Sequence, residues 1–376
     1  MYFINRPTGH ITNLIKTTKM KTFLFTAVAA ISMSLCSQSA QARSWRVNSN
    51  PDAKANFASI NDAMASLDVF NGDTIYLDPG CVLNNQTISK GVTVIGPGYN
   101  LEESAYSTQL QGTTKIPKGS NTIKIEGCNM AAIDMVDASN ITVERCKLAS
   151  ASHNSCSNIS YLSCFIYGAT YSKSSIEDMN HSTFTISNCI LLNKISGIDN
   201  TSTITNNVII GWARTYYDEG NIYLLENVTN SSITNNIIIN TNTGYSVDEN
   251  QRPYFYKNNT IKNTAVEDNN TISNNVLSTE AQHAFANYPN NKFIGATAAD
   301  IFTLTGAADA MYKLKEGSPA IGYGTNGYDC GAFSGPYPYV LSGRPRFLPY
   351  IYEAIIPNQP TDGKLNVTLK IKTQNE

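Results

Sequence analysis

The chain has little charge and few of the residues that mark common binding sites. Only 15% of its 376 residues are Asp, Glu, Lys or Arg, and the formal net charge is −2. No basic run occurs beyond the N-terminus, so we expect no nucleic-acid partner. No CxxC pair occurs, and His153 and His181 stand apart from any ligand spacing, which argues against a zinc site.

No apolar run is long enough to cross a bilayer, which takes about 20 residues. The apolar stretch 23–35 follows Lys16, Lys19 and Lys21 and precedes Ala40-Gln41-Ala42. This order is typical of an export signal, so residues 1–42 are predicted to be a signal peptide, with Met20 as an alternative start. The mature chain would then begin near Arg43, carry no transmembrane segment, and be secreted, periplasmic or at the cell surface.

The cysteines are few, and those of the predicted mature chain are odd in number, so they cannot form a complete set of disulfides. Eight occur in the chain, and removal of residues 1–42 leaves seven. An odd count indicates unpaired thiols, and four of these cysteines recur at the same position of a repeat. We expect buried free thiols, with a pairing of Cys156 with Cys146 or Cys164 as the alternative to test.

The sequence does contain one short motif that is repeated eight times, as in ITVERCKLA and STITNNVII. Each copy is a short run rich in Ile, Val, Thr, Tyr and Phe, a pair of small or polar residues, and a second such run. A central position, called column zero, is occupied by Cys128, Cys146, Cys164, Cys189, Asn207, Asn236, Asn259 and Asn275. The positions three residues before and two after it are apolar in every copy, which predicts stacked short strands around one core.

The residues of column zero are expected to allow a sharp bend between strands and to form hydrogen bonds along the stack. Asn tolerates the left-handed backbone conformation of a sharp bend, and strands stacked about 4.8 Å apart would bring one amide above the next as a ladder. Cys at the same column is small enough for the bend and behaves as a small hydrophobe.

These residues resemble the right-handed parallel β-helix of the pectin-lyase-like superfamily over roughly residues 43–335. The sequence from Trp45 through GDTIYLDPG to VIGPGYNL resembles the start of secreted β-helix proteins of Bacteroidetes. Residues 312–335 resemble the last coil of such proteins. The resemblance implies an all-β fold, a single-stranded right-handed parallel β-helix, and leaves the activity open because the superfamily holds lyases, hydrolases, tailspikes and adhesins.

Two further segments complete the expected organisation. Phe57, Ile60, Met64 and Leu67 recur at helical spacing and predict an N-terminal capping helix over the open end of the solenoid. Residues 336–376 form a Pro-rich C-terminal tail in which Leu365–Lys372 alternates and could add one strand. The domains expected are therefore 1–42, 43–335 and 336–376.

Irregular spacing of the repeat predicts where function lies. The column-zero spacings are 18, 18, 25, 18, 29, 23 and 16 residues, which places insertions at 167–181, 211–228 and 240–252. Each insertion follows the same strand of its copy, so we expect all of them on one side of the stack. They are either ordinary solvated loops or the walls of a shared groove.

Their residue types suit a polysaccharide, because rings stack on pyranoses and guanidinium groups hold carboxylates. The first insertion contains Tyr167, Glu177, Asp178 and His181. The predicted substrate-binding residues are Trp212, Tyr216, Glu219, Tyr245, Glu249 and Arg252. The predicted catalytic residues are Arg214, Tyr217, Asp218 and Asp248.

Two chemistries stay open for these residues. In a lyase Arg214 or Arg252 would neutralise a uronate carboxylate and Tyr216, Tyr217 or His181 would take the proton, whereas in a glycoside hydrolase Asp218 and Asp248 would pair. The four insertion carboxylates at 218, 219, 248 and 249 could instead hold Ca²⁺. The motifs of pectate lyases and polygalacturonases are absent from the coils, so the alternative is a non-catalytic surface adhesin or structural module.

Overall fold

A computed structural model provides the coordinates of the chain. It describes residues 42–99, 107–167, 175–212, 224–241, 246–247, 253–254, 269–278, 288, 290–294, 298–344, 350–355, 359, 363–365 and 367–372. Chain contacts divide the protein into Met1–Arg43 and Ser44–Glu376. The predicted signal peptide lies outside the described residues except for its last position.

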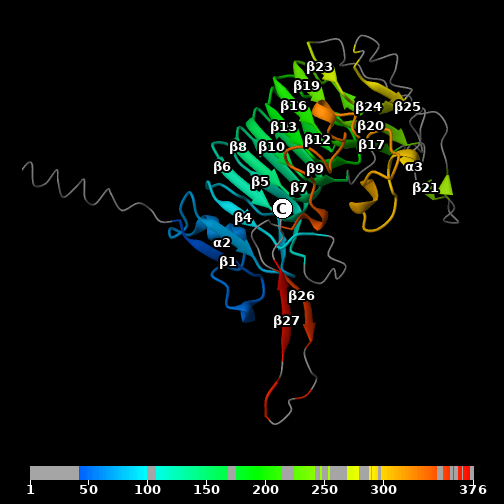
Figure 1. Cartoon of the computed structure of the whole chain (residues 1–376). Helices are drawn as coiled ribbons and strands as arrows, with labels where there is room; N and C mark the ends of the chain where they lie inside the picture. The colour runs from blue at the N-terminus through cyan, green and yellow to red at the C-terminus, as the bar shows by residue number, and fades with distance from the viewer. Residues whose placement is uncertain are drawn as a thin grey trace, which may run out of the picture. The chain divides into compact units, whose positions relative to one another are not determined.

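One long sheet contains ten parallel strands in the order β1-β2-β4-β6-β8-β10-β13-β16-β19-β23 (Figure 1). Their bounds are Ser44–Val47, Thr74–Leu77, Thr93–Ile95, Asn121–Glu126, Ser139–Glu144, Ser157–Leu162, Phe184–Ser187, Ser202–Thr205, Ser231–Thr234 and Thr271–Ser273. Every neighbouring pair for which the register is known is parallel, as in β6 with β8 and β16 with β19.

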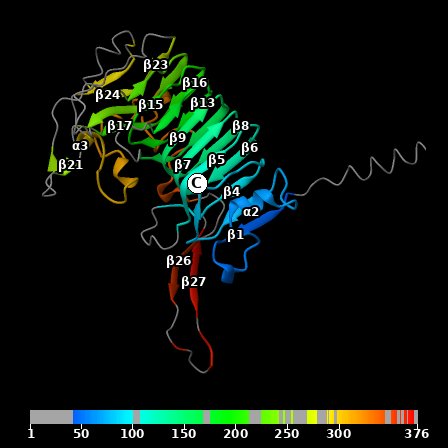
Figure 2. The ribbon, with the colours of Figure 1, turned by 180° about the vertical axis from the view of Figure 1, so that it is seen from behind.

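A second long sheet has thirteen strands, and the chain alternates between the two sheets (Figure 2). Its first strands are β3 (Val82–Asn84), β5 (Gln109–Ile116), β7 (Asn129–Val136) and β9 (Lys147–Asn154). Beyond β9 it divides into one row with β11 (Phe165–Ile166), β14 (Ile190–Leu191), β17 (Val208–Trp212), β20 (Ile237–Thr241), β24 (Val276–Ser278) and β25 (Lys292–Ile294), and another with β12 (Ile176–Asp178), β15 (Ile195–Ser196) and β18 (Leu225–Glu226). An all-β fold with two long parallel sheets, not closed into a barrel, is therefore confirmed.

The remaining elements are short. Two antiparallel hairpins join β21 (Ser246–Val247) to β22 (Pro253–Tyr254) and β26 (Tyr350–Ile355) to β27 (Thr368–Lys372). The helical segments are η1 (Pro51–Ala53), α2 (Ile60–Ala65), α3 (Ala298–Ile301), η4 (Ala310–Tyr312), η5 (Thr325–Gly327) and η6 (Leu341–Gly343). The segment at the end of the tail, in which apolar and polar residues alternate, thus contains a strand, β27, which pairs with β26.

The helix near the N-terminus is shorter than its periodicity predicts. α2 begins after Ser59, whose side chain accepts a hydrogen bond from the Asp62 amide, and it ends at Ala65. Ile60 and Ala63 enter the main core, whereas Leu67 lies beyond the helix and is 91% exposed. The inclusion of Leu67 in the helical face was therefore wrong.

The apolar columns of the repeat fill the space between the two sheets. Ile125, Val143, Tyr161, Ile186 and Ile204 pair in register from strand to strand and are fully buried. The column two residues after column zero is buried in the same core, as expected from the alternation of side chains along a strand.

Column zero carries the expected ladder of asparagines. The Asn207 amide donates to Asn236 Oδ1 at 3.0 Å, Asn236 donates to Asn275 at 2.9 Å, and Asn275 donates to Asn291 at 2.9 Å. Each Nδ2 also donates to a backbone carbonyl of the preceding repeat, namely those of Ile186, Ile204, Ile233 and Ile272. Each rung therefore satisfies polar groups in two neighbouring repeats.

The membership of the ladder differs from the sequence prediction. Asn236 bonds directly to Asn275, and β19 and β20 pair directly with β23 and β24. No rung therefore stands between Asn236 and Asn275, and Asn291 supplies a further rung, while the copy assigned to Asn259 lies outside the described residues. The rung at Asn291 was missed because its copy, YPNNKFI, has Pro in its first run.

The left-handed bend residue also differs from the prediction, because it is the one before column zero. Positive φ angles occur at Gly127 (65°), Arg145 (53°), Ser163 (52°), Asn188 (56°), Asn206 (55°), Asn235 (58°) and Asn274 (57°). Column zero itself provides the inward hydrogen bonds, and its neighbour provides the turn.

Cysteine performs the same task as asparagine in the first half of the column. The thiols of Cys146, Cys164 and Cys189 each donate to a carbonyl of the preceding repeat, at 3.6, 3.3 and 3.4 Å. The Cys189 amide donates to Asn207 Oδ1 at 2.8 Å, which joins the two halves. The seven described cysteines are free and buried, so the expectation of unpaired thiols is confirmed.

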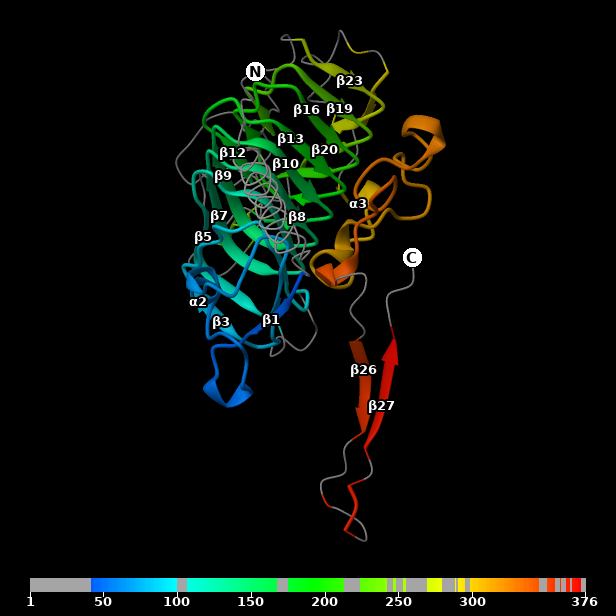
Figure 3. The same ribbon diagram turned by 90° about the vertical axis from the view of Figure 1, so that its left-hand side faces the viewer.

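Residues 298–344, called the strap, pack against the outer face of the 13-stranded sheet along the row from β11 to β24 (Figure 3). Phe302, Tyr312, Cys330 and Tyr339 of the strap form a second apolar cluster with outward side chains of the sheet, which are Phe165, Ile190, Leu192, Val208, Ile210, Ile237, Ile239 and Val276. Residues 312–335 were expected to be a last coil, but they contribute no strand to either sheet.

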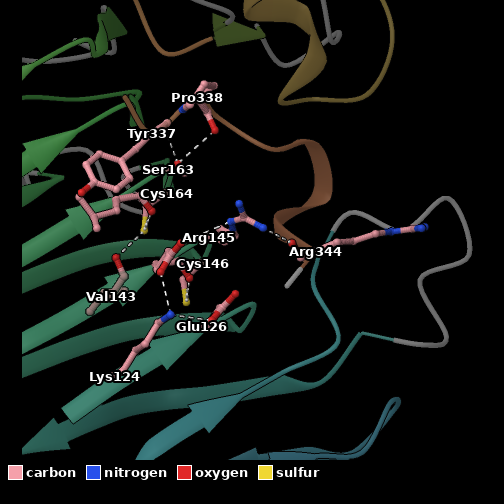
Figure 4. A network of polar contacts seen from close by, with 12 residues as sticks. Lys124, Glu126, Val143, Arg145, Cys146, Ser163, Cys164, Tyr337, Pro338 and Arg344 are labelled. Atoms are coloured by element: carbon pink, nitrogen blue, oxygen red, sulfur yellow. Dashed lines mark hydrogen bonds and ion pairs between the residues drawn. The ribbon is translucent and has the colours of Figure 1, made fainter. Parts of the chain in front are cut away.

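The bend residues hold the strap by hydrogen bonds. Asn274 donates to the carbonyl of Tyr323, Asn188 to that of Ala332, Ser163 to that of Tyr337 and Arg145 to that of Arg344. As the strap advances along the chain, its partners therefore fall on ever earlier repeats. Figure 4 shows the last of these contacts, with the Arg145 guanidinium directed at the backbone of Arg344 and Ser163 at Tyr337 and Pro338.

A buried histidine lies in the main core. His153 Nδ1 is 3.0 Å from the Glu177 carbonyl, which only accepts, so Nδ1 carries the proton and Nε2 accepts from the Tyr161 hydroxyl at 2.8 Å. Burial lowers the pKa of His153 from 6.5 to about 4, although the Glu177 carbonyl opposes that shift. His153 is thus a neutral structural group at physiological pH.

We expect Asn236→Leu to lower the free energy of unfolding by about 3 kcal/mol or more, because it leaves buried amides and carbonyls without partners. Urea unfolding measures this loss. Thr203→Ala, on an exposed outward position of β16, is the control and should change stability by less than about 0.5 kcal/mol. Equal unfolding midpoints for Asn236→Leu and the unmodified protein would contradict the ladder.

Acid should destabilise the fold through His153. Its folded pKa lies below the unfolded value, so its contribution is complete above pH 6.5 and is lost as the pH falls toward 4. We expect a loss of about 3 kcal/mol over this window, which His153→Gln should abolish. Unfolding curves at several pH values test this, and an unchanged pH dependence in the variant would refute it.

Candidate functional site

Nearly all of the predicted site residues lie outside the described part of the chain. These are Arg214, Tyr216, Tyr217, Asp218, Glu219, Tyr245, Asp248, Glu249 and Arg252. Trp212 is the last residue of β17, where its backbone pairs with Thr241 of β20. The catalytic and binding roles of these residues stay predictions.

The strands that flank the insertions all belong to the 13-stranded sheet. β11 ends just before the predicted insertion at 167–181, β17 runs into the one at 211–228, and β20 runs into the one at 240–252. β17 and β20 are direct neighbours, and β14 lies between β11 and β17. Within the first two predicted insertions the chain returns to the same sheet, as β12 in 167–181 and as β18 in 211–228.

One row of outward-facing residues, called the outer row, runs across the 13-stranded sheet. It consists of Lys115, Asp134, Ser152, Glu177, Ser196 and Glu226, which are partners in register across β5, β7, β9, β12, β15 and β18. The residue before each of the last five is buried in the main core. Side chains alternate along a strand, so the outer row faces away from that core.

The carboxylates of the outer row differ in their surroundings. The Ser152 hydroxyl donates to Asp134 Oδ1 at 3.0 Å, and Lys194 forms an ion pair with Glu226 in which both side chains are 28% exposed. Glu177 is exposed to solvent. Glu177 therefore has the carboxylate most accessible to a ligand.

The register also limits the chemistry of the row. Its acids stand on every second strand, about 9.6 Å apart if strands are spaced about 4.8 Å. Serines separate the acids, so no two carboxylates of the row are on neighbouring strands. No group of three or more His, Cys, Asp or Glu suited to a metal occurs among the described residues. What the row can do is accept hydrogen bonds from the hydroxyl groups of a ligand.

Residues predicted in the first insertion separate in the structure. Glu177 joins the outer row, whereas Asp178 is buried and accepts hydrogen bonds from the Ser182 amide and hydroxyl, each at 2.7 Å. His181 is exposed, with Nδ1 2.8 Å from Asp199. The sequence did not predict that these residues form one row. β12, β15 and β18 have only two or three residues each, which is too short to show the alternation of inward and outward side chains.

A cavity of about 260 Å³ lies between the strap and the sheet. Val208 and Ile237 contribute to its lining from β17 and β20, and Tyr312, Cys330 and Phe333 from the strap. Burial raises the pKa of Cys330 to about 12, and its thiol donates to the Asn274 carbonyl at 3.1 Å. Cys330 is therefore a structural thiol and a poor nucleophile.

The chain matches no protein-family model and no curated protein. Within the described ranges, none of the helices has both the length and the apolar character needed to span a membrane.

Proposed function

We propose that this chain is an exported, right-handed parallel β-helix, similar to the pectin-lyase-like superfamily and to secreted proteins of Bacteroidetes, that binds a polysaccharide. The alternation of the chain between two parallel sheets supports the fold, and the Lys-apolar-Ala-Gln-Ala order of residues 1–42 supports export. The glycan would lie along the outer row, between the insertion loops.

One observation carries the proposal. The first two predicted insertions, 167–181 and 211–228, each contain a carboxylate of the outer row, Glu177 on β12 and Glu226 on β18. Both carboxylates belong to one row of register partners, which supports a binding surface along that row. Carboxylates and serines in such a row suit the many hydroxyl groups of a sugar chain.

The insertion residues would complete the recognition. The rings of Trp212, Tyr216 and Tyr245 suit the apolar faces of pyranoses. Arg214 and Arg252 suit the carboxylates of an acidic glycan, and Ca²⁺ held by loop carboxylates would bridge such a glycan to the acidic row. Cleavage, by a lyase or hydrolase mechanism, would depend on Arg214, Tyr217, Asp218 and Asp248.

A non-catalytic adhesin or surface module is the second candidate. The observation in its favour is that Glu226 is paired with Lys194 and Asp134 is hydrogen-bonded to Ser152. Carboxylates held in this way stabilise a surface, whereas a general acid or base needs access to its substrate.

A panel of neutral and uronate-containing glycans, with and without Ca²⁺, tests the proposal by calorimetry and by detection of products. We expect binding of at least one glycan, weakened about tenfold by Glu177→Gln, since a hydrogen bond to a charged group contributes about 1.5–3 kcal/mol. Glu316→Gln, an exposed carboxylate of the strap, is the control and should bind like the unmodified protein.

Absence of binding across the panel, or equal affinity of Glu177→Gln, contradicts the proposed site. Unsaturated ends that vanish in Arg214→Ala would identify a lyase. Binding without products would favour the adhesin.

A further inference from the structure

The C-terminal hairpin of β26 and β27 carries an apolar stripe that stays exposed. Leu365, Val367, Leu369 and Ile371 recur at every second position, and each is between 45% and 57% exposed. The two apolar clusters of the described residues contain none of these four. Side chains at alternate positions of an extended chain lie on one face, so the four residues form one stripe, called the hairpin stripe.

The other strand of the hairpin has apolar residues at the positions paired with the stripe. β26 and β27 are antiparallel, and Ile351 is the register partner of Ile371 and Ala354 that of Leu369 (Figure 3). Paired residues share a face of a sheet, so these positions widen the apolar face. A two-stranded hairpin alone is at best marginally stable in water, and an exposed apolar face of this kind marks a contact with another molecule.

The segment that contains the stripe is basic, although the chain as a whole is not. Residues 344–372 include five basic and two acidic residues, whereas the whole chain has a formal net charge of −2. Lys370 is exposed and is the register partner of Glu353. Lys364 is also exposed and forms no ion pair with the described residues. The charge of the segment is therefore complementary to an anionic surface.

A second copy of the strand is a poor partner for β27. Among the described residues β27 has β26 as its only strand partner. Two β27 strands side by side would bring Lys370 and Lys372 of both copies together, and lysines on an edge strand typically prevent such pairing. A bilayer of anionic lipid has no such conflict, because an apolar face enters the boundary with the acyl chains while cations stay among the headgroups.

We propose that the C-terminal hairpin binds the surface of a bilayer that contains anionic phospholipid. The hairpin stripe enters the boundary between headgroups and acyl chains, and the basic residues contact the lipid phosphates. The exported protein would in this way be held at a membrane surface through a segment that includes none of the predicted glycan-binding residues. The inference therefore stands or falls independently of glycan binding.

Cosedimentation with vesicles tests the inference on residues 43–376, the predicted mature chain. This part is used because the apolar stretch 23–35 could bind vesicles by itself, and chain contacts make Ser44–Glu376 a unit of its own. We expect binding to vesicles of phosphatidylglycerol and phosphatidylcholine in equal parts. Binding to phosphatidylcholine alone should be at least about tenfold weaker, and added salt should weaken binding to the anionic vesicles.

The stripe is tested by Leu369→Thr/Ile371→Thr, which should weaken binding to the anionic vesicles at least about tenfold. Threonine favours strands, so the variant removes the apolar contact and keeps the hairpin. The matched control is Leu67→Thr/Ile321→Thr, which changes two exposed apolar residues elsewhere and should bind like the unmodified chain. Equal urea unfolding midpoints of the variant and the unmodified chain would show that the loss of binding comes from the surface.

The charge is tested by Lys364→Glu, which should weaken binding to the anionic vesicles about fivefold or more. Lys313→Glu, at an exposed lysine of the strap, is its control and should bind like the unmodified chain. Equal binding to both kinds of vesicle, no binding to either, or unchanged binding of Leu369→Thr/Ile371→Thr overturns the inference. A dimer that this double variant abolishes, without vesicle binding, also overturns it in favour of a second copy of the chain.

Discussion

The structure depends on one inward-pointing side chain at each bend between the two sheets. Asn236 accepts from the Asn207 amide and donates to the carbonyl of Ile204 and to Asn275. Buried peptide groups at a bend cannot pair within their own repeat, and leaving them unpaired costs about 1–3 kcal/mol each. Each repeat therefore completes the hydrogen bonding of its neighbour, and the thiols of the first repeats do the same through longer, weaker bonds.

The bend also positions what lies outside the core. The residue before each rung adopts a positive φ, and Arg145, Ser163, Asn188 and Asn274 use their side chains to hold the strap. The strap covers the apolar outer side of one part of the sheet. The outer row, which runs across β5, β7, β9, β12, β15 and β18, is the surface to which we assign glycan binding.

Much of the fold could be predicted from sequence because the apolar columns repeat in register. The ladder could be predicted for the same reason, since stacked strands bring equal positions together. Asn291 shows the limit: it joins the ladder although its copy, YPNNKFI, departs from the repeat's pattern, because pairing is decided by neighbours distant in the chain. The outer row was missed for a related reason, since Glu177 and Glu226 look like loop residues until the register of β12 and β18 is known. The strap has no period of its own, so its path along the sheet could not be inferred.

Amide hydrogen exchange tests the ladder most directly. The backbone amides of Cys189, Asn207, Asn236 and Asn275 donate to a side chain of the next rung and to no backbone carbonyl of their own repeat. The account predicts that they exchange as slowly as the amides in the centres of the long sheets. Exchange at the rate of solvent-exposed turn amides would show that the side-chain column does not hold the repeats together.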